Sequence, residues 1–113
     1  MKTYFFEKLE VWKEYISLDK SIYHTTRAFP SEEKFGLTSQ LRRASVSISS
    51  NLAKGTSRYT DKDKAHFTTM SFSSTMEVLN QLIICKELNF ITENEYLKIR
   101  KSIEKITNML NAL

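Results

Sequence analysis

The hydrophobic and polar residues between positions 36 and 58 follow a helical pattern with small residues on its flanks. Successive apolar positions are separated by four, three, four and four residues, as on one stripe of a helix. The stripe consists of Leu37, Leu41, Ala44, Ile48 and Leu52. Its flanks carry Ser45, Ser47, Ser49, Ser50 and Ala53 in place of long charged side chains. Because small side chains let helices approach closely, we expect the helix at residues 37–55 to contact neighbours on more than one face.

A second helix is predicted at residues 3–28, where two apolar stripes adjoin. One stripe is Phe5, Leu9, Trp12, Ile16 and Tyr23, and the other is Val11, Tyr15, Leu18 and Ile22. So broad an apolar face is typical of a helix that lies between two neighbours. The helix ends before Pro30, because proline disfavours helical geometry in the residue that precedes it.

The helix predicted at residues 61–88 carries apolar residues on two opposing faces. Phe67, Met70, Val78, Cys85 and Leu88 lie on one face, and Phe72, Met76, Leu79 and Ile83 lie on the other. In a monomeric bundle each helix turns one side to water. Because both faces of this helix need to be buried, the pattern predicts a contact between subunits.

The helix at residues 93–112 has the clearest local start signal in the chain. Thr92 and Glu95 form a capping box, with Ile91 and Tyr96 at the positions of a hydrophobic staple. Asn89 is the expected end of the helix that precedes it. The apolar seam of this helix is Ile99, Ile103, Ile106, Leu110 and Leu113.

The remaining loops contain most of the residues that interrupt helices. Ser31 is an expected N-cap, the helix at 37–55 starts at Gly36 or is capped by Thr38, and Gly55 is the expected left-handed residue at its end. The chain has only two glycines and one proline in 113 residues, which argues against a β-sandwich or barrel. We therefore predict an all-α fold: one domain over residues 1–113, an up-down-up-down antiparallel four-helix bundle.

Composition and charge narrow the functional classes. Cys85 is the only cysteine, which excludes a disulfide within the chain and a cysteine-based zinc site. No apolar run approaches the roughly 20 residues of a membrane span, and the N-terminal residues lack a secretory pattern, so we expect a cytoplasmic protein. The net charge of +4 favours polyanions as partners, but only weakly.

Few residues are suited to catalysis or to metal binding. His24 and His66 have no ligand partner at the spacing of a metal site. Arg58 and His66 loosely resemble the Arg…His motif of helical-bundle ribonucleases, but their spacing is longer and a loop lies between them. There is no nucleophile elbow and no glycine-rich phosphate loop. We expect no enzyme activity, no cofactor and no metal.

Two groups of polar residues are candidates for function. The first is a predicted polar network that fixes helix register and assembly, in which Glu77 pairs with a residue of the helix at 37–55. Its members are Gln40, Arg43, Asn51, Glu77 and Gln81, with Arg42 as an alternative partner of Glu77. The second is a predicted nucleic-acid surface, in which an aromatic residue lies among cations. Its members are Arg42, Arg43, Lys54, Arg58, Tyr59, Lys62 and Lys64.

Several segments resemble, in order and spacing, the four-helix bundle family encoded by intervening sequences of bacterial 23S ribosomal RNA genes. They are Phe6–Trp12 (FEKLEVW), Phe29-Pro30, Glu33, Phe35–Leu37, Gln40–Ala44, Val46–Ile48 and Ser50–Gly55, followed by Arg58, Phe67, Glu77, Gln81-Leu82 and Leu88–Ile91. The resemblance spans nearly the whole chain. In this sequence Lys54 stands where the family usually has an acidic residue, which makes the following loop more basic.

The resemblance implies a cytosolic bacterial protein that assembles as a ring-like homopentamer. A related accessory protein of diversity-generating retroelements works with a reverse transcriptase, which implies RNA, DNA or a nucleic-acid-processing protein as a partner. We expect a non-enzymatic homo-oligomeric scaffold or adaptor that binds RNA. The alternative is a protein–protein interaction module with no role in nucleic-acid binding.

Overall fold

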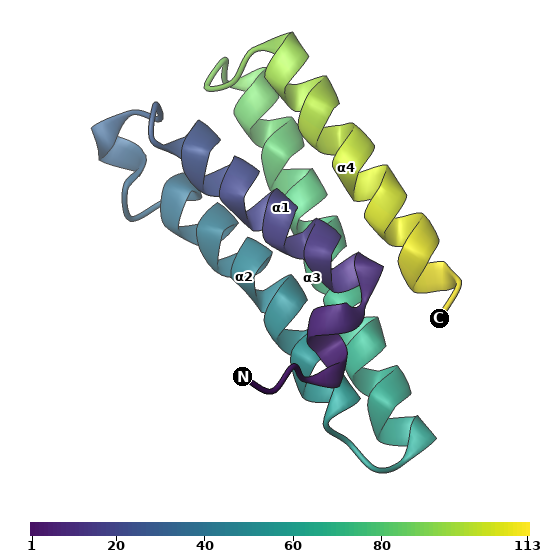
Figure 1. Cartoon of the computed structure of the whole chain (residues 1–113). Helices are drawn as coiled ribbons and strands as arrows, with labels where there is room; N and C mark the ends of the chain where they lie inside the picture. Colours follow the sequence, from purple (N-terminus) through teal and green to yellow (C-terminus); the bar gives the residue numbers. More distant parts are fainter.

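The computed structural model describes residues 1–113 as an all-α structure without strands (Figure 1). The four α-helices are α1 (Glu10–Thr26), α2 (Leu37–Thr56), α3 (Asp61–Glu87) and α4 (Glu93–Asn111). The chain reverses direction between successive helices, and α1 and α3 each contact both α2 and α4. The molecule measures 43 × 25 × 25 Å. No helix combines the length and the hydrophobicity needed to cross a membrane.

One apolar stripe from each helix forms the core. In α1 only one of the two predicted stripes is buried, the one with Val11, Tyr15, Leu18 and Ile22. From the other stripe, Phe5 and Tyr23 are exposed and the remaining members are half-buried. In α4 the predicted seam is buried from Ile99 to Leu110, whereas Leu113 is 65% exposed. The helix periodicity therefore located the core stripes of α2 and α4, but it made the buried face of α1 too wide and missed Leu82 in the buried stripe of α3.

The helix predicted from residue 3 is divided near its start. Phe5–Lys8 form a 3-10 turn, Leu9 is extended, and α1 begins at Glu10. The Tyr4 N–H donates to the Glu7 carboxylate over 2.7 Å, which stabilises the short turn. The Phe6 ring meets Trp12 of α1 edge-on, with 5.2 Å between the ring centroids. Because of these contacts, the segment packs against α1 and does not continue it as a longer helix.

The start of α2 also differs from the prediction, because Ser31 caps no α-helix. Residues Ser31–Glu33 form a separate 3-10 turn, and α2 begins at Leu37. The Leu37 N–H donates to the Glu33 carboxylate over 3.2 Å. An acidic side chain thus accepts one of the backbone N–H groups that have no partner at the start of the helix. A Cβ on Gly36 would lie 2.9 Å from an oxygen of the same carboxylate, the movable end of the Glu33 side chain.

Gly55 does not terminate α2, because it lies inside the helix and has no positive φ. Its function is close packing against α3: a Cβ at this position would lie 2.9 Å from the Cβ of Phe67. The helix instead ends at Thr56, and the Ser57 hydroxyl donates to the Lys54 carbonyl over 2.7 Å. The glycine is thus required by a tertiary contact and not by the local turn.

Serine hydroxyls form hydrogen bonds between α2 and both neighbouring helices. Ser45 and Ser49 donate to the two carboxylate oxygens of Asp19 on α1. On the other side, Ser71 of α3 donates to the Ile48 carbonyl over 2.9 Å. Burial raises the pKa of the Asp19 carboxyl, and the bonds from the serines partly offset that rise. The small flank residues thus allow close contacts with α1 and α3.

The turn between α3 and α4 follows the sequence signals. Asn89 has φ 61°, and the N–H groups of Asn89 and Phe90 donate to the carbonyls of Lys86 and Cys85. This is the Schellman arrangement that closes a helix with a left-handed residue. The capping box is present, with 3.1 Å bonds in both directions between Thr92 and Glu95. Both local predictions are confirmed.

We expect Gly55→Ala to destabilise the fold, because the added methyl group would overlap Phe67 on α3. Overpacking lowers the free energy of unfolding by about 1–3 kcal/mol, whereas the better helix propensity of alanine raises it by less than about 1 kcal/mol. Urea denaturation of the variant against the parent chain measures the difference. Lys54→Ala, an exposed change on the same turn, is the control and should have little effect. A Gly55→Ala protein as stable as the parent would contradict the close contact.

We expect Asp19→Asn to stabilise the protein more at neutral pH than at acidic pH. A carboxyl whose pKa is raised by folding binds its proton more tightly in the native state, so its contribution to stability is lost as pH rises through that pKa. The asparagine has no such ionisation. Free energies of unfolding at pH 7 and pH 4 for both proteins test this. A difference between variant and parent that is the same at both pH values would contradict it.

Candidate functional site

The residues of the predicted nucleic-acid surface fall into two groups at opposite ends of α2. Arg42 and Arg43 lie in its first half, whereas Lys54 lies in its last turn, 12 residues further on. At 1.5 Å per residue, this places Arg42 and Lys54 about 18 Å apart along the helix. Arg58, Tyr59, Lys62 and Lys64 belong to the second group. The expected single basic surface is therefore two surfaces.

Arg42 is held in place by the last turns of α1. Its Nε donates to the Thr26 hydroxyl over 2.8 Å, and its Nη2 donates to the Tyr23 carbonyl over 3.4 Å. The guanidinium carbon lies 4.6 Å from the centroid of the Tyr23 ring, close enough for a cation–π contact. No carboxylate lies within ion-pair distance of it. Arg42 is thus a fixed cation without a counter-charge.

Further cations surround Arg42 at the end of the bundle that carries the α1–α2 loop. We call Lys20, Arg27, Lys34, Arg42 and Arg43 the corner cluster, and none of them forms an ion pair. A hollow of about 370 Å³ opens between Tyr23, Phe35 and the two arginines of α2, and Phe35 is 89% exposed. A second hollow, which shares Tyr23 with the first, is lined by Lys20, His24 and Arg27 together with the acidic Asp19.

Sequence reasoning missed three members of the corner cluster: Lys20, Arg27 and Lys34. A signal for the first two was present, because Lys20, His24 and Arg27 recur at intervals of four and three on the polar side of α1. Nothing in the sequence showed that this side of α1 adjoins the arginines of α2. Lys34 was hidden in the loop between them, where it follows two glutamates.

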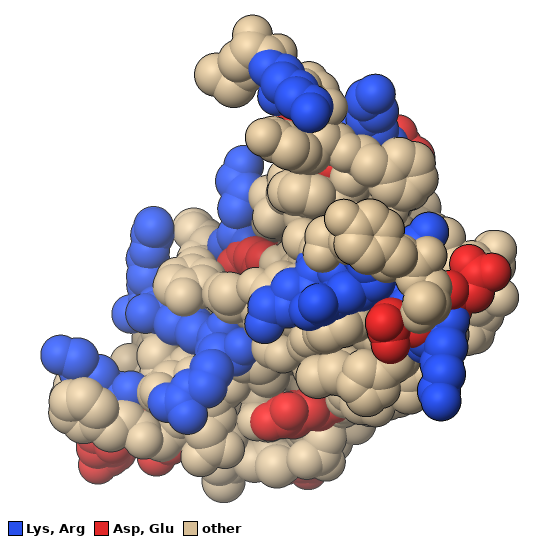
Figure 2. All heavy atoms as spheres, turned by 90° about the horizontal axis from the view of Figure 1, so that it is seen from below, with Lys and Arg blue, Asp and Glu red and all other residues tan.

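The second basic group surrounds the α2–α3 loop, at the end of the bundle shown in Figure 2. Residues 54–64 contain four Lys or Arg and two Asp residues, so their formal charge is +2. Arg58 lies over the Phe67 ring, 4.7 Å from its centroid, and Tyr59 is 99% exposed. Thr60 caps α3 by accepting the Asp63 N–H. Figure 2 shows basic side chains spread over this face, with acidic ones among them.

The predicted polar network does not form as one unit within the chain. Glu77 accepts a 3.3 Å bond from Gln81, its neighbour on α3, and no arginine lies within ion-pair distance of it. Asn51 instead donates to Ser47 of its own helix. Gln40 and Arg43 are exposed, and Arg43 donates to Ser39. Arg42, the alternative partner, is bound to α1, so neither arginine of α2 pairs with Glu77.

Only one stripe of α3 is covered by the rest of the chain. Val78 and Cys85, predicted on one apolar face, belong to the core together with small polar residues. On both flanks of this stripe the larger apolar side chains lie partly in solvent, 36–52% exposed. Met76 and Ile83 lie on one flank, and Met70, Ile84 and Leu88 lie on the other. Within one chain, these flanks have no partner.

The residues considered for catalysis form neither a metal site nor a reactive thiol. No group of three His, Cys, Asp or Glu side chains is arranged to hold a metal ion. His24 and His66 are exposed, and His66 and Arg58 both contact the Phe67 ring. Burial, with a smaller effect of a nearby carboxylate, raises the pKa of the Cys85 thiol to about 11. The thiol is therefore protonated at neutral pH and unsuited to nucleophilic attack.

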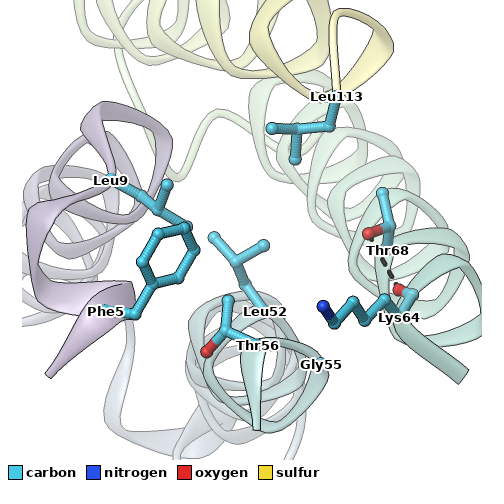
Figure 3. A pocket seen from close by; sticks show the side chains of 8 residues that line it. All are labelled: Phe5, Leu9, Leu52, Gly55, Thr56, Lys64, Thr68 and Leu113. Atoms are coloured by element: carbon cyan, nitrogen blue, oxygen red, sulfur yellow. Dashed lines mark hydrogen bonds between the residues drawn. The ribbon is translucent and has the colours of Figure 1, made fainter. Parts of the chain in front are cut away.

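A cavity of about 370 Å³ lies near the end of the bundle that carries the α2–α3 loop (Figure 3). Its lining comes from the N-terminal segment, α2, α3 and the last residue of the chain. The lining residues are Phe5, Leu9, Leu52, Gly55, Thr56, Lys64, Thr68 and Leu113. Lys64 is the one charged residue among them, and Figure 3 shows its side chain extending from α3 toward α2.

Comparison with known proteins identifies the relatives of this fold. A crystal structure from Bacteroides thetaiotaomicron, described as a protein with unknown function from the S23 ribosomal protein family, matches with a TM-score of 0.83. The match covers 90% of this chain and 95% of that chain at 18% identity, which shows a shared fold. No curated protein is significantly similar in sequence. The model of the family described as 23S rRNA-intervening sequence protein matches residues 7–112. The chain therefore belongs to the 23S rRNA-intervening sequence protein family.

Proposed function

We propose that this protein is a non-enzymatic homo-oligomeric scaffold, a ring-like pentamer, that binds RNA through the corner cluster. The observation that carries the RNA-binding part is Arg42, a cation fixed on Tyr23 without a carboxylate partner among four other unpaired cations. Unpaired cations gathered on one surface are suited to a polyanion. The family's description, which refers to 23S rRNA, is consistent with RNA as that polyanion.

The corner cluster offers the two kinds of contact that single-stranded RNA requires. Its lysines and arginines can neutralise successive phosphates. Phe35 is 89% exposed beside them, with the Lys34 ammonium 5.5 Å from the centroid of its ring. An exposed aromatic ring can stack on an unpaired base without selecting its sequence. Because duplex RNA buries its bases, this arrangement favours unpaired segments.

The flanks of α3 support the oligomeric part of the proposal. Met76 and Ile83 on one flank and Ile84 on the other lie partly in water in the single chain. Transferring such side chains into a contact is favourable in proportion to the apolar area that leaves water. Two separate flanks on one helix allow each subunit to contact two others, as a ring requires.

We expect the double substitution Lys34→Gln with Arg43→Gln to weaken binding of a single-stranded RNA and to flatten its salt dependence. Each lost phosphate contact lowers the slope of log K against log salt by about 0.7, so the two together lower it by about 1.4. Fluorescence anisotropy at 50 and 150 mM salt measures both effects. Lys98→Gln with Lys101→Gln on exposed α4 positions removes the same charge and should change binding less. Equal losses in both variants, or no salt-sensitive binding at micromolar protein, would contradict the proposal.

We expect the protein in solution to have a mass several times the 13.2 kDa of one chain, with five copies as the predicted number. Ile83→Glu or Ile84→Glu places a charge on a flank of α3 and should lower that mass, because a buried carboxylate without a partner is unfavourable. Light scattering at tens of micromolar protein measures the mass. Circular dichroism confirms that each variant keeps its helices, as expected for partly exposed positions. A parent protein of 13.2 kDa would contradict self-association.

A further inference from the structure

The cavity shown in Figure 3 has a property that neither RNA binding nor assembly uses: an apolar wall beside a single free cation. Its volume of about 370 Å³ lies within the range of small-molecule sites, about 300–1,000 Å³. The apolar wall consists of Phe5, Leu9, Leu52 and Leu113, which come from three separate parts of the chain.

The apolar wall is only partly covered by the protein. Leu52 at its base is 3% exposed, whereas Phe5 and Leu113 at its sides are each 65% exposed. Apolar surface that remains in contact with water can be covered favourably by an apolar group of matching size. The wall therefore suits a ligand with a hydrocarbon body.

The polar groups of the cavity determine what else the ligand must contain. The hydroxyls of Thr56 and Thr68 already donate, over 2.8 and 3.1 Å, to the carbonyls of Ala53 and Lys64. The Lys64 ammonium forms no ion pair, and no acidic residue lines the cavity. The free donor among the side chains is thus a cation, which favours an anionic acceptor.

We propose that this cavity binds a small amphiphilic carboxylate, with its hydrocarbon chain on Leu9 and Leu52 and its carboxylate on Lys64. A phosphodiester chain would use the cation but leave the apolar wall in water. A neutral apolar molecule would cover the wall but leave the ammonium without a counter-charge. Both requirements are met by one medium-chain fatty acid anion.

Octanoate, 1-octanol and acetate, each titrated into the full chain, test the proposal. We expect octanoate to bind saturably at one site per chain in calorimetry. Amide signals of Leu52, Gly55 and Thr68 should shift in the corresponding NMR titration. 1-Octanol should bind about tenfold more weakly, because it lacks the charge-assisted contact, and acetate should not bind at the same concentrations. Non-saturating shifts centred on Met76 and Ile83 would show detergent-like adsorption and overturn the proposal.

Substitution of the cation separates this site from the RNA surface. Lys64→Met retains an apolar stem and should weaken octanoate binding about tenfold while leaving 1-octanol binding unchanged. Lys62→Met, with the same loss of charge two residues away, is the matched control and should bind octanoate like the parent. Both positions are exposed, so both variants should fold, as circular dichroism can verify. Octanoate binding by Lys64→Met at the parent's affinity would overturn the proposal.

The proposal does not depend on RNA binding. Lys34→Gln with Arg43→Gln alters the opposite end of α2 and should leave octanoate affinity unchanged. Loss of octanoate binding in that variant would place the ligand in the corner cluster and overturn the assignment to this cavity.

Discussion

The close contact between α2 and α3 determines where most other side chains lie. Gly55 allows the Phe67 backbone to approach α2, and Ser71 reaches across to the Ile48 carbonyl. Two small residues, Gly55 and Ser71, lie at this contact together with the Phe67 side chain. Met76, Ile83 and Ile84 lie outside it, on the flanks of α3, and are 36–39% exposed. The packing that stabilises the bundle therefore covers only one stripe of α3.

The surroundings of the cations differ between the two ends of the bundle. Arg42 is fixed against Tyr23 at one end of α2, while Lys64 lies beside an apolar cavity near the other end. The first cation has neighbours of the same sign, and the second is isolated within its cavity lining. The two proposals thus place a polyanion and a small single anion at different ends of one molecule.

Features governed by neighbours in sequence could be predicted, and features governed by neighbours in space could not. The capping box at Thr92 and the left-handed Asn89 depend on a few consecutive residues, and both are present. Gly55 obeyed the local rule for a helix end, yet its actual constraint is Phe67 on another helix. In the same way, Glu77 was expected to pair with Arg43 or Arg42, but Arg43 donates to Ser39 of its own helix and Arg42 is bound to α1. The membership of the corner cluster depended on which face of α1 adjoins α2, which periodicity alone does not specify.

The hydrogen bonds of Arg42 have a consequence for the direction from which an anion can approach. Nε and Nη2 are engaged with Thr26 and the Tyr23 carbonyl, and one face of the guanidinium lies on the Tyr23 ring. Nη1 and the opposite face remain for a ligand. Lysine has a single charged nitrogen on a flexible stem and could not hold both α1 contacts while presenting a fixed edge. The orientation of a bound phosphate would therefore be set by the C-terminal turns of α1, which need not touch it.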